Sequence, residues 1–198
     1  LDYNNLYSQA STVAVARKLA LLGNAVLYSE NDAVSGNPVR YTASEFAVDR
    51  GATVDMVSRG YEYVLSTTAN LPADIPTCVY NSKTYCSYGP GRTGNGAYVV
   101  AGHSYGYRLA PFLPGSPAIY GGPCRGSGSI VVEAGRIRVD GTITAYGGTI
   151  SAHSQPSAGE IMLFADDFDV GIDALITAEG CHNTQFNNSI AVPGRVAL

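Results

Sequence analysis

The chain has 198 residues, which is enough for one good-sized domain, or for a small domain joined to a larger one, with a buried hydrophobic core. Only 14% of the residues are charged, whereas Gly (23 residues) and Tyr (14 residues) are abundant, and this balance favours strands and turns over long solvated helices. The net charge of −4, with Lys and Arg scattered along the chain, excludes the broad cationic surface of a nucleic-acid-binding protein.

The first predicted element is a helix within residues 4–26. Ser11 suits the N-cap position, Gly23 suits the stop position, and the turns between them are rich in Ala and Leu. The longest apolar run, Val13–Leu22, is interrupted by two basic residues and is too short to cross a bilayer, so we expect no membrane span.

Residues 25–68 predict a small antiparallel β unit, because short extended runs alternate with turn residues such as Arg59 and Gly60. Two prolines in the stretch that follows indicate a connection between two structural units. We therefore expect residues 1–72 to form an attachment or assembly unit, made of the helix and this β unit. Residues 73–198 are expected to form a second domain, rich in Gly and Tyr.

The four cysteines predict the disulfides of an extracellular or particle-surface protein, with unpaired apolar cysteines in a reducing compartment as the alternative. Cys78 and Cys86 enclose a short polar loop that a disulfide could close, and Cys124 and Cys181 flank the Gly-rich C-terminal half. Neither pair has zinc-ligand spacing with a nearby His, so we expect no metal site. The Gly-rich run 89–96 lacks the Lys and the helix of a phosphate-binding loop, so we expect no cofactor.

The stretch VVAGHSYG, residues 99–106, matches the G-x-S-x-G elbow that exposes the nucleophilic serine of α/β-hydrolases. Asp173 and His182 follow Ser104 in the order that such a triad requires, as in a small secreted serine esterase. Four prolines in the next stretch argue against this, because they prevent the helix that should back the nucleophile. The stretch also aligns with the repeat described next, so we favour a turn at Ser104 and keep the esterase as an alternative.

The strongest pattern is a repeat of short β-branched strands with Gly at the corners, in which residues 129–148 are echoed by residues 160–180. A unit of this kind buries its apolar face by stacking on its own copy. We therefore expect the two copies to lie on adjacent coils, with ladders of equivalent side chains inside. The matched positions are Ile130 with Ile161, Ala134 with Ala165, Val139 with Val170, and Ile143 with Ile176.

Runs such as GSIVVEAGRIRVDGTITAYGG resemble the Gly-rich rungs of right-handed parallel β-solenoids in bacterial surface proteins and in bacteriophage tailspikes and tail fibres, over residues 95–182. The preceding RGATVDMVSRGYEYVLS is similar to the small β motif that often introduces a tailspike solenoid. The resemblance implies a mainly β fold whose C-terminal part is a short solenoid-like domain, an extracellular or virion-surface location, and no catalytic residues.

We therefore expect a non-enzymatic structural or adhesive surface protein, most specifically a virion or extracellular assembly component. A short solenoid has open ends, so we expect self-association into a homo-oligomer; other surface proteins and a cell-surface glycan are further candidate partners. A carbohydrate-binding module is a second alternative, because tyrosines suit sugar stacking and protein interfaces. The candidate binding residues are Tyr85, Tyr88, Tyr105, Tyr107 and Tyr120.

Overall fold

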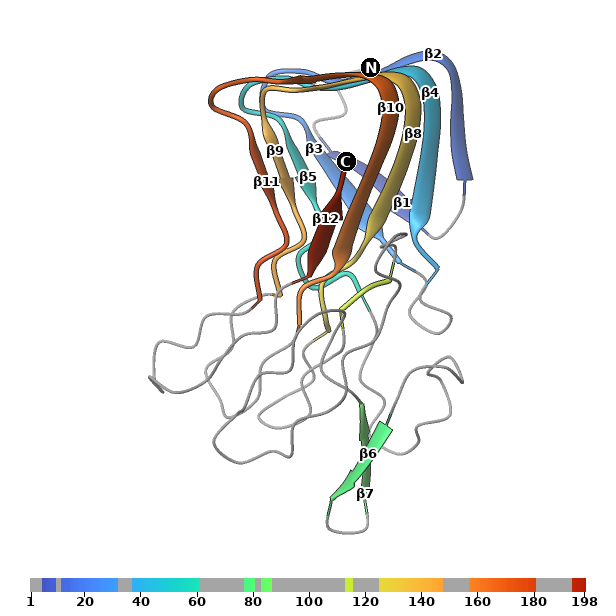
Figure 1. The fold of residues 1–198 in the computed structure, drawn as a ribbon, viewed down its shortest axis with the longest axis vertical. Coiled ribbons are helices and arrows are strands. Elements are labelled where there is room, and N and C mark those ends of the chain that lie inside the picture. Colours follow the sequence, from blue (N-terminus) through green and yellow to red (C-terminus); the bar gives the residue numbers. More distant parts are fainter. Residues whose placement is uncertain are drawn as a thin grey trace.

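A computed structural model shows how the chain is folded and describes residues 5–9, 12–31, 37–60, 77–80, 83–86, 113–115, 125–147, 157–180 and 194–198. These residues form twelve strands and no helix. Ten of the strands belong to two five-stranded sheets, and the other two form a separate hairpin (Figure 1).

The two large sheets contain only parallel strands. The first, called here the long sheet, consists of β2 (Thr12–Leu21), β4 (Val39–Val48), β8 (Ile130–Val139), β10 (Glu160–Val170) and β12 (Arg195–Ala197). The second, the short sheet, consists of β1 (Asn5–Gln9), β3 (Val26–Glu30), β5 (Thr53–Asp55), β9 (Thr142–Thr144) and β11 (Leu175–Thr177). The hairpin pairs β6 (Thr77–Tyr80) with β7 (Lys83–Cys86) in antiparallel fashion.

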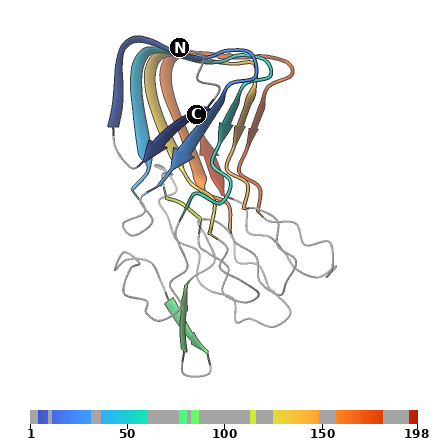
Figure 2. The ribbon, with the colours of Figure 1, turned by 180° about the vertical axis from the view of Figure 1, so that it is seen from behind.

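The chain winds through the two sheets in turn, so that the strands stack as the coils of a parallel β-solenoid (Figures 1 and 2). Each coil contains one strand of the long sheet followed by one strand of the short sheet. We number the coils 1 to 4, and they consist of β2 with β3, β4 with β5, β8 with β9, and β10 with β11. β1 precedes coil 1 on the short sheet, and β12 follows coil 4 on the long sheet.

The predicted N-terminal helix is wrong, because Thr12–Leu21 forms the strand β2. This strand pairs in parallel with β4, where Leu19 lies beside Phe46 and Leu21 beside Val48. Burial alternates along the first half of β2, with Val13 more buried than Ala14, as in a strand with one face toward a core. Helix propensity is a weak preference, and pairing within the sheet overrides it here.

The predicted antiparallel unit at residues 25–68 is also wrong. β3 pairs in parallel with β5, and β4 pairs in parallel with both β2 and β8. Turn residues between short strands occur in a solenoid as well as in a hairpin, so the local pattern did not distinguish the two. Because β4 pairs with β8 and β5 pairs with β9, segments from both sides of residue 72 share the same two sheets.

The predicted stacking of the two repeat copies is confirmed. Ile176 lies beside Ile143 in the short sheet, and Val170 lies beside Val139 in the long sheet. The other two matched pairs, Ile130 with Ile161 and Ala134 with Ala165, are in register as well. The mainly β, parallel arrangement expected of this region is therefore present, whereas the stretch around Ser104 lies outside the described residues.

The core consists of columns of side chains that point into the solenoid from successive coils. One column contains Leu27, Val54, Ile143 and Ile176, and its first three members are fully buried. The strands β2, β4, β8 and β10 bend (Figure 1), and burial along β8 changes near its centre, where Ala134 is partly buried and Gly135 is exposed. Beyond this bend the outer face of the long sheet carries charged side chains.

Candidate functional site

Three stretches of chain between coil 2 and β12 are inserted at the same corner of the solenoid, where a short-sheet strand ends and the next long-sheet strand begins. They are residues 61–124, 148–156 and 181–193, and we call this edge the insertion corner. Its walls are the described residues at their boundaries, namely 56–60, 125–129, 145–147, 157–160, 178–180 and Gly194. The insertions between coils 2, 3 and 4 therefore begin and end at the same edge of the solenoid.

The two ends of the largest insertion meet at this corner. The Gly60 amide donates a hydrogen bond to the Gly126 carbonyl at 2.7 Å, and the Gly128 amide donates to the Met56 carbonyl at 2.7 Å. Arg125 holds the junction with its side chain, because its Nε and Nη2 atoms donate to the Gly60 carbonyl at 3.0 and 2.8 Å. A salt bridge from Arg125 to Glu30 of β3 ties the junction to coil 1.

The interior of the insertion corner is polar, in contrast to the apolar core between the sheets. The Asn31 amide oxygen accepts a hydrogen bond from the Ser129 amide at 2.6 Å, and its nitrogen donates to Ser129 Oγ at 2.9 Å. Ser127 Oγ donates to the Met56 carbonyl at 2.9 Å. These contacts satisfy buried backbone groups that leave the sheet ladders. The fully or almost fully buried polar residues here are Ser29, Asn31, Ser127, Ser129, Ser157 and Glu160.

Glu160 connects the insertion to the last two strands of the long sheet. Its carboxylate is completely buried, accepts a hydrogen bond from the Leu113 amide at 2.8 Å and lies 3.1 Å from Arg195 Nη1 of β12. The Glu160 amide donates to the Leu113 carbonyl at 3.1 Å, and the Gly115 amide donates to the Ser127 carbonyl at 2.7 Å. One described part of the insertion, residues 113–115, is therefore fastened to coils 3 and 4.

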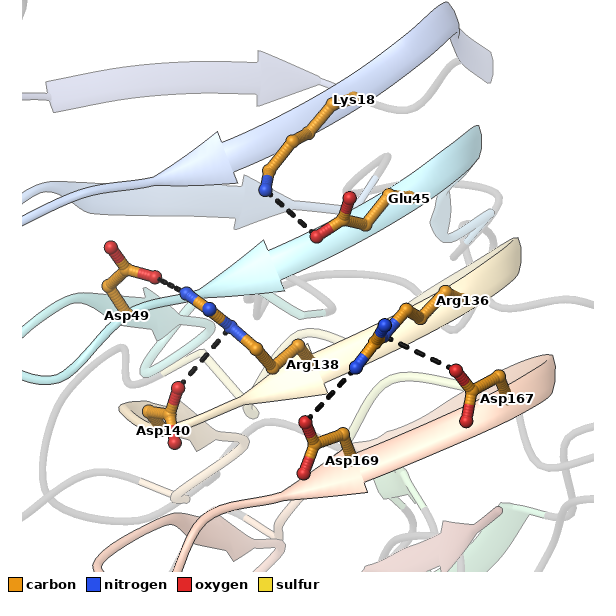
Figure 3. A network of polar contacts seen from close by, with 8 residues as sticks. All are labelled: Lys18, Glu45, Asp49, Arg136, Arg138, Asp140, Asp167 and Asp169. Carbon is orange, nitrogen blue, oxygen red and sulfur yellow. Dashed lines mark hydrogen bonds and ion pairs between the residues drawn. The ribbon is translucent and has the colours of Figure 1, made fainter.

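A second group of polar contacts crosses the outer face of the long sheet beyond the bend (Figure 3). Lys18, Glu45, Arg136 and Asp167 occupy equivalent positions on coils 1 to 4, and we call them the charge column. Lys18 Nζ lies 2.8 Å from Glu45, and Arg136 lies 3.3 Å from both Asp167 and Asp169. Neighbouring members alternate in sign, so this order of coils is favoured over one that would stack like charges.

Glu45 titrates differently from an isolated glutamate. The hydrogen bond from Lys18 is the main reason why the pKa of Glu45 lies below its usual value, and this effect exceeds the opposing effect of desolvation. Because the pKa in the folded state is the lower one, the pair stabilises the fold above the pKa of the unfolded chain. This stabilisation is lost as the pH falls through the pKa of the folded state.

We predict that Lys18→Met raises the titration midpoint of Glu45, because it removes the hydrogen bond and the nearest positive charge. The measurement is an NMR titration of the Glu45 side-chain carboxyl carbon in both proteins. Arg50→Met is the matched control, since Arg50 is a cation of coil 2 that pairs with Asp173 rather than with Glu45. An unchanged Glu45 midpoint in Lys18→Met would contradict the assignment.

Of the three residues of the formal catalytic triad, the structure describes only Asp173. It lies in the turn after β10, its side chain is 60% exposed, and its carboxylate is 2.7 Å from Arg50 Nη2 on coil 2. Ser104 and His182 lie outside the described residues. Where the structure describes the path between neighbouring parallel strands, that path runs through the other sheet, whereas an α/β-hydrolase uses crossover helices.

The predicted tyrosine surface and the predicted disulfides fall mostly on undescribed residues. Tyr85 lies in β7, where it pairs with Cys78 of β6, and Cys86 pairs with Thr77. The remaining candidates lie outside the described residues and are Tyr88, Tyr105, Tyr107, Tyr120, Cys124 and Cys181. The disulfides and the tyrosine site stay predictions.

A shallow open groove crosses the long sheet at its bend, between the insertion corner and the charge column. Phe164 is its most prominent side chain and is 64% exposed. The other lining residues are Val15, Ala16, Thr42, Ala43, Ser44, Glu133, Ala134, Gly135, Met162 and Asp166. Across the described ranges, no three His, Cys, Asp or Glu side chains are grouped so as to hold a metal ion, and no helix could span a membrane.

Comparisons with known proteins identify no relative of the chain. No protein-family model matches the chain, and neither a curated protein nor a solved structure matches it significantly. The insertion corner is therefore the site that the geometry itself singles out, and sequence reasoning missed its key residues, Arg125 and Glu160. The available signal was the polar and Gly-rich stretch before each repeated strand, SGS before Ile130 and AGE before Ile161.

Proposed function

We propose that this protein is a non-enzymatic scaffold of a cell or virion surface, in which a β-solenoid presents residues 61–124 to a binding partner. The observation that carries the proposal is that all three insertions between coils 2, 3 and 4, and onward to β12, start and finish at one corner. In stacked-repeat proteins, insertions gathered on one face commonly form the binding face. The coil supplies the rigid support, and the largest insertion supplies the contacts.

The composition of the insertion supports adhesion as its role. All five candidate binding tyrosines lie within residues 61–124. Tyrosine offers a large apolar ring together with a hydroxyl, so it stacks on sugar rings and anchors protein interfaces at little cost in side-chain entropy. A surface glycan is the first ligand class to test. The resemblance of the repeat to tailspike and surface-protein rungs supports the proposed location.

We predict that replacing residues 61–111 with a short Gly/Ser linker abolishes glycan binding while the coil stays folded. The linker can close because a Cβ on Gly60 would lie 3.0 Å from the Gly115 carbonyl oxygen, so the retained segment 113–115 lies beside Gly60. Shortening a surface insertion changes the free energy of unfolding by only about 1 kcal/mol through loop entropy. Binding is measured on a glycan array, and folding by circular dichroism with urea unfolding.

The matched control replaces residues 148–156, the shortest of the three insertions at this corner, and should retain binding. Retained binding in the variant that lacks residues 61–111, or loss of its cooperative unfolding, would contradict the proposal. Specific labelling of Ser104 by a fluorophosphonate probe, absent in Ser104→Ala, would contradict its non-enzymatic part.

A further inference from the structure

Small side chains line the groove at the bend of the long sheet. Val15, Ala43 and Ala134 lie side by side on coils 1, 2 and 3. Ser44 Oγ donates a hydrogen bond to the Ala16 carbonyl at 3.2 Å, which joins coils 1 and 2 here. The lining residues come from all four coils, so with about 4.8 Å between strands the groove is about 14 Å long. An extended chain of about four residues matches this length, and the small side chains leave room for its backbone.

An aromatic side chain stands at the coil 4 end of this groove. Leu163 of β10 is buried in the core, and the alternation of a strand directs the next residue, Phe164, to the outer face. Phe164 lies beside Glu133 in an outward row in which coils 1 and 2 carry the smaller Ala14 and Thr42. Because alternation along β10 sets its direction, the ring belongs to the face of the sheet rather than to its edge.

The charged side chains that line the groove are both acidic. Glu133 forms a salt bridge with Arg40 of β4, whereas the described contacts place no cation against Asp166. Asp166 is exposed and follows Phe164 by two positions, so it lies on the same outer face, about 7 Å farther along β10. The cations of the neighbouring charge column pair with other acids (Figure 3). The groove therefore presents an aromatic ring close to a carboxylate that the described contacts leave unneutralised.

We propose that this groove docks a basic segment of a partner protein, with an Arg or Lys side chain over the Phe164 ring and its charge beside Asp166. The face of an aromatic ring attracts a cation, and the planar group of Arg also stacks on it. The carboxylate adds an ion pair. Both groups favour a positive charge, which distinguishes this partner from a neutral glycan. The proposal does not depend on the glycan binding proposed above for residues 61–124.

The first experiment compares two short peptides on the unaltered 198-residue protein. One is Gly-Arg-Ala-Arg-Gly, blocked at both ends, and in the other citrulline replaces both arginines. Citrulline keeps the length and the planar end of the arginine side chain but carries no charge. Binding is followed by NMR through the backbone amides of the residues that line the groove, such as Ser44, Gly135 and Asp166.

We expect the arginine peptide to shift these amides and the citrulline peptide to bind roughly three- to tenfold more weakly, since it lacks both the cation–π contact and the ion pair. The affinity of the arginine peptide should fall as the salt concentration rises. Equal affinity of the two peptides, shifts confined to residues outside the groove, or no binding of either peptide would overturn the proposal.

Substitutions at Phe164 test the role of the ring. Phe164→Leu keeps an apolar side chain but removes the aromatic face, so the arginine peptide should bind roughly two- to fivefold more weakly. Phe164→Tyr is the matched control, because it keeps the ring and should leave the affinity unchanged. The side chain faces outward, so we expect both variants to fold, and circular dichroism checks this. Equal affinity of the two variants would overturn the placement of the cation on the ring.

Neutralisation of Asp166 tests the role of the carboxylate. Asp166→Asn should weaken binding of the arginine peptide roughly two- to fivefold. Asp173→Asn is the matched control, because it removes the same charge in the turn after β10, where Asp173 pairs with Arg50 and does not line the groove. An equal effect of the two substitutions would mean that the peptide responds only to the net charge of the protein, and would overturn the proposal.

A neutral oligosaccharide, maltohexaose, is titrated in parallel with the peptides. We expect it to leave the amides of the groove unshifted. Shifts of these amides by maltohexaose, without shifts by the arginine peptide, would overturn the proposal in favour of a glycan in the groove.

Discussion

Substitution of Gly159 by Ala is expected to lower the free energy of unfolding by about 3 kcal/mol or more. A Cβ at this position would lie 1.8 Å from the Gly128 carbonyl oxygen and 3.0 Å from the Ser127 carbonyl oxygen, both on coil 3. Hydrogen bonds between the coils fix their separation at about 4.8 Å, so neither backbone can move aside without breaking the ladder. The melting temperature should fall by about 10 °C.

The matched control for this substitution is Gly135→Ala at the bend of β8. A Cβ there would have only the Ser44 carbonyl oxygen nearby, at 3.1 Å, and the position is exposed. We expect a change within about 1 kcal/mol. Both proteins are compared by urea unfolding followed by circular dichroism, and equal losses of stability would show that close packing of the coils at the insertion corner is not the cause.

Truncation of Ile143 to Ala is expected to cost about 2–5 kcal/mol, because it leaves a cavity in the fully buried centre of a core column. Val54 lies beside it on one side and Ile176 on the other, so the gap has packed neighbours in both directions. Those neighbours belong to backbones held in register and cannot collapse into the space. Chemical denaturation gives the free energy, and the dependence on denaturant concentration should be unchanged.

Ile176→Ala removes the same atoms from the same column one coil later and serves as the control. Ile176 is only partly buried, so less apolar surface returns to water and the cavity opens to solvent. We expect a loss clearly smaller than that of Ile143→Ala. A loss as large as that of Ile143→Ala would contradict the partial burial of Ile176 as the reason for the difference.

The stacking of the two repeat copies could be predicted from sequence, because parallel strands in register give equivalent residues the same neighbours on every coil. Ile143 and Ile176 are each followed by Thr and Ala, and this recurrence indicates which residues lie beside one another. Residues 1–72 offer no such copy. For those residues only local patterns are available, and such patterns do not indicate which strand pairs with which. A hairpin and a solenoid coil therefore could not be distinguished.

The failure of the predicted helix has a specific cause in β2. The register between β2 and β4 shifts between Val15 and Lys18, at the bend. The inward residues Val15 and Leu19 are four positions apart because Arg17 between them is exposed at the bend, so the alternation of a strand is interrupted. In a segment rich in Ala, Leu, Arg and Lys, the resulting spacing is close to that of a helix.

The insertion corner could not be predicted, because its contacts join residues far apart in the chain. Arg125 reaches Glu30 across 95 positions, and Asn31 reaches Ser129 across 98 positions. A single sequence contains nothing that pairs these residues. The G-x-S-x-G motif at Ser104 consists of consecutive residues and can be recognised in the sequence. The insertion corner forms only when the coils stack and bring distant residues together.

Gly60 and Gly126 are hydrogen-bonded to each other, so the stability of the coil depends only weakly on the number of residues between them. Closing a flexible loop costs free energy that grows only with the logarithm of its length, so a doubling costs about 0.6 kcal/mol. The part of this segment before the fastened residues 113–115 can therefore be lengthened, shortened or exchanged while coils 2 and 3 keep their register. An architecture of this kind separates the sequence requirements of the inserted segment from those of its support, and it offers a defined position for grafting foreign binding loops.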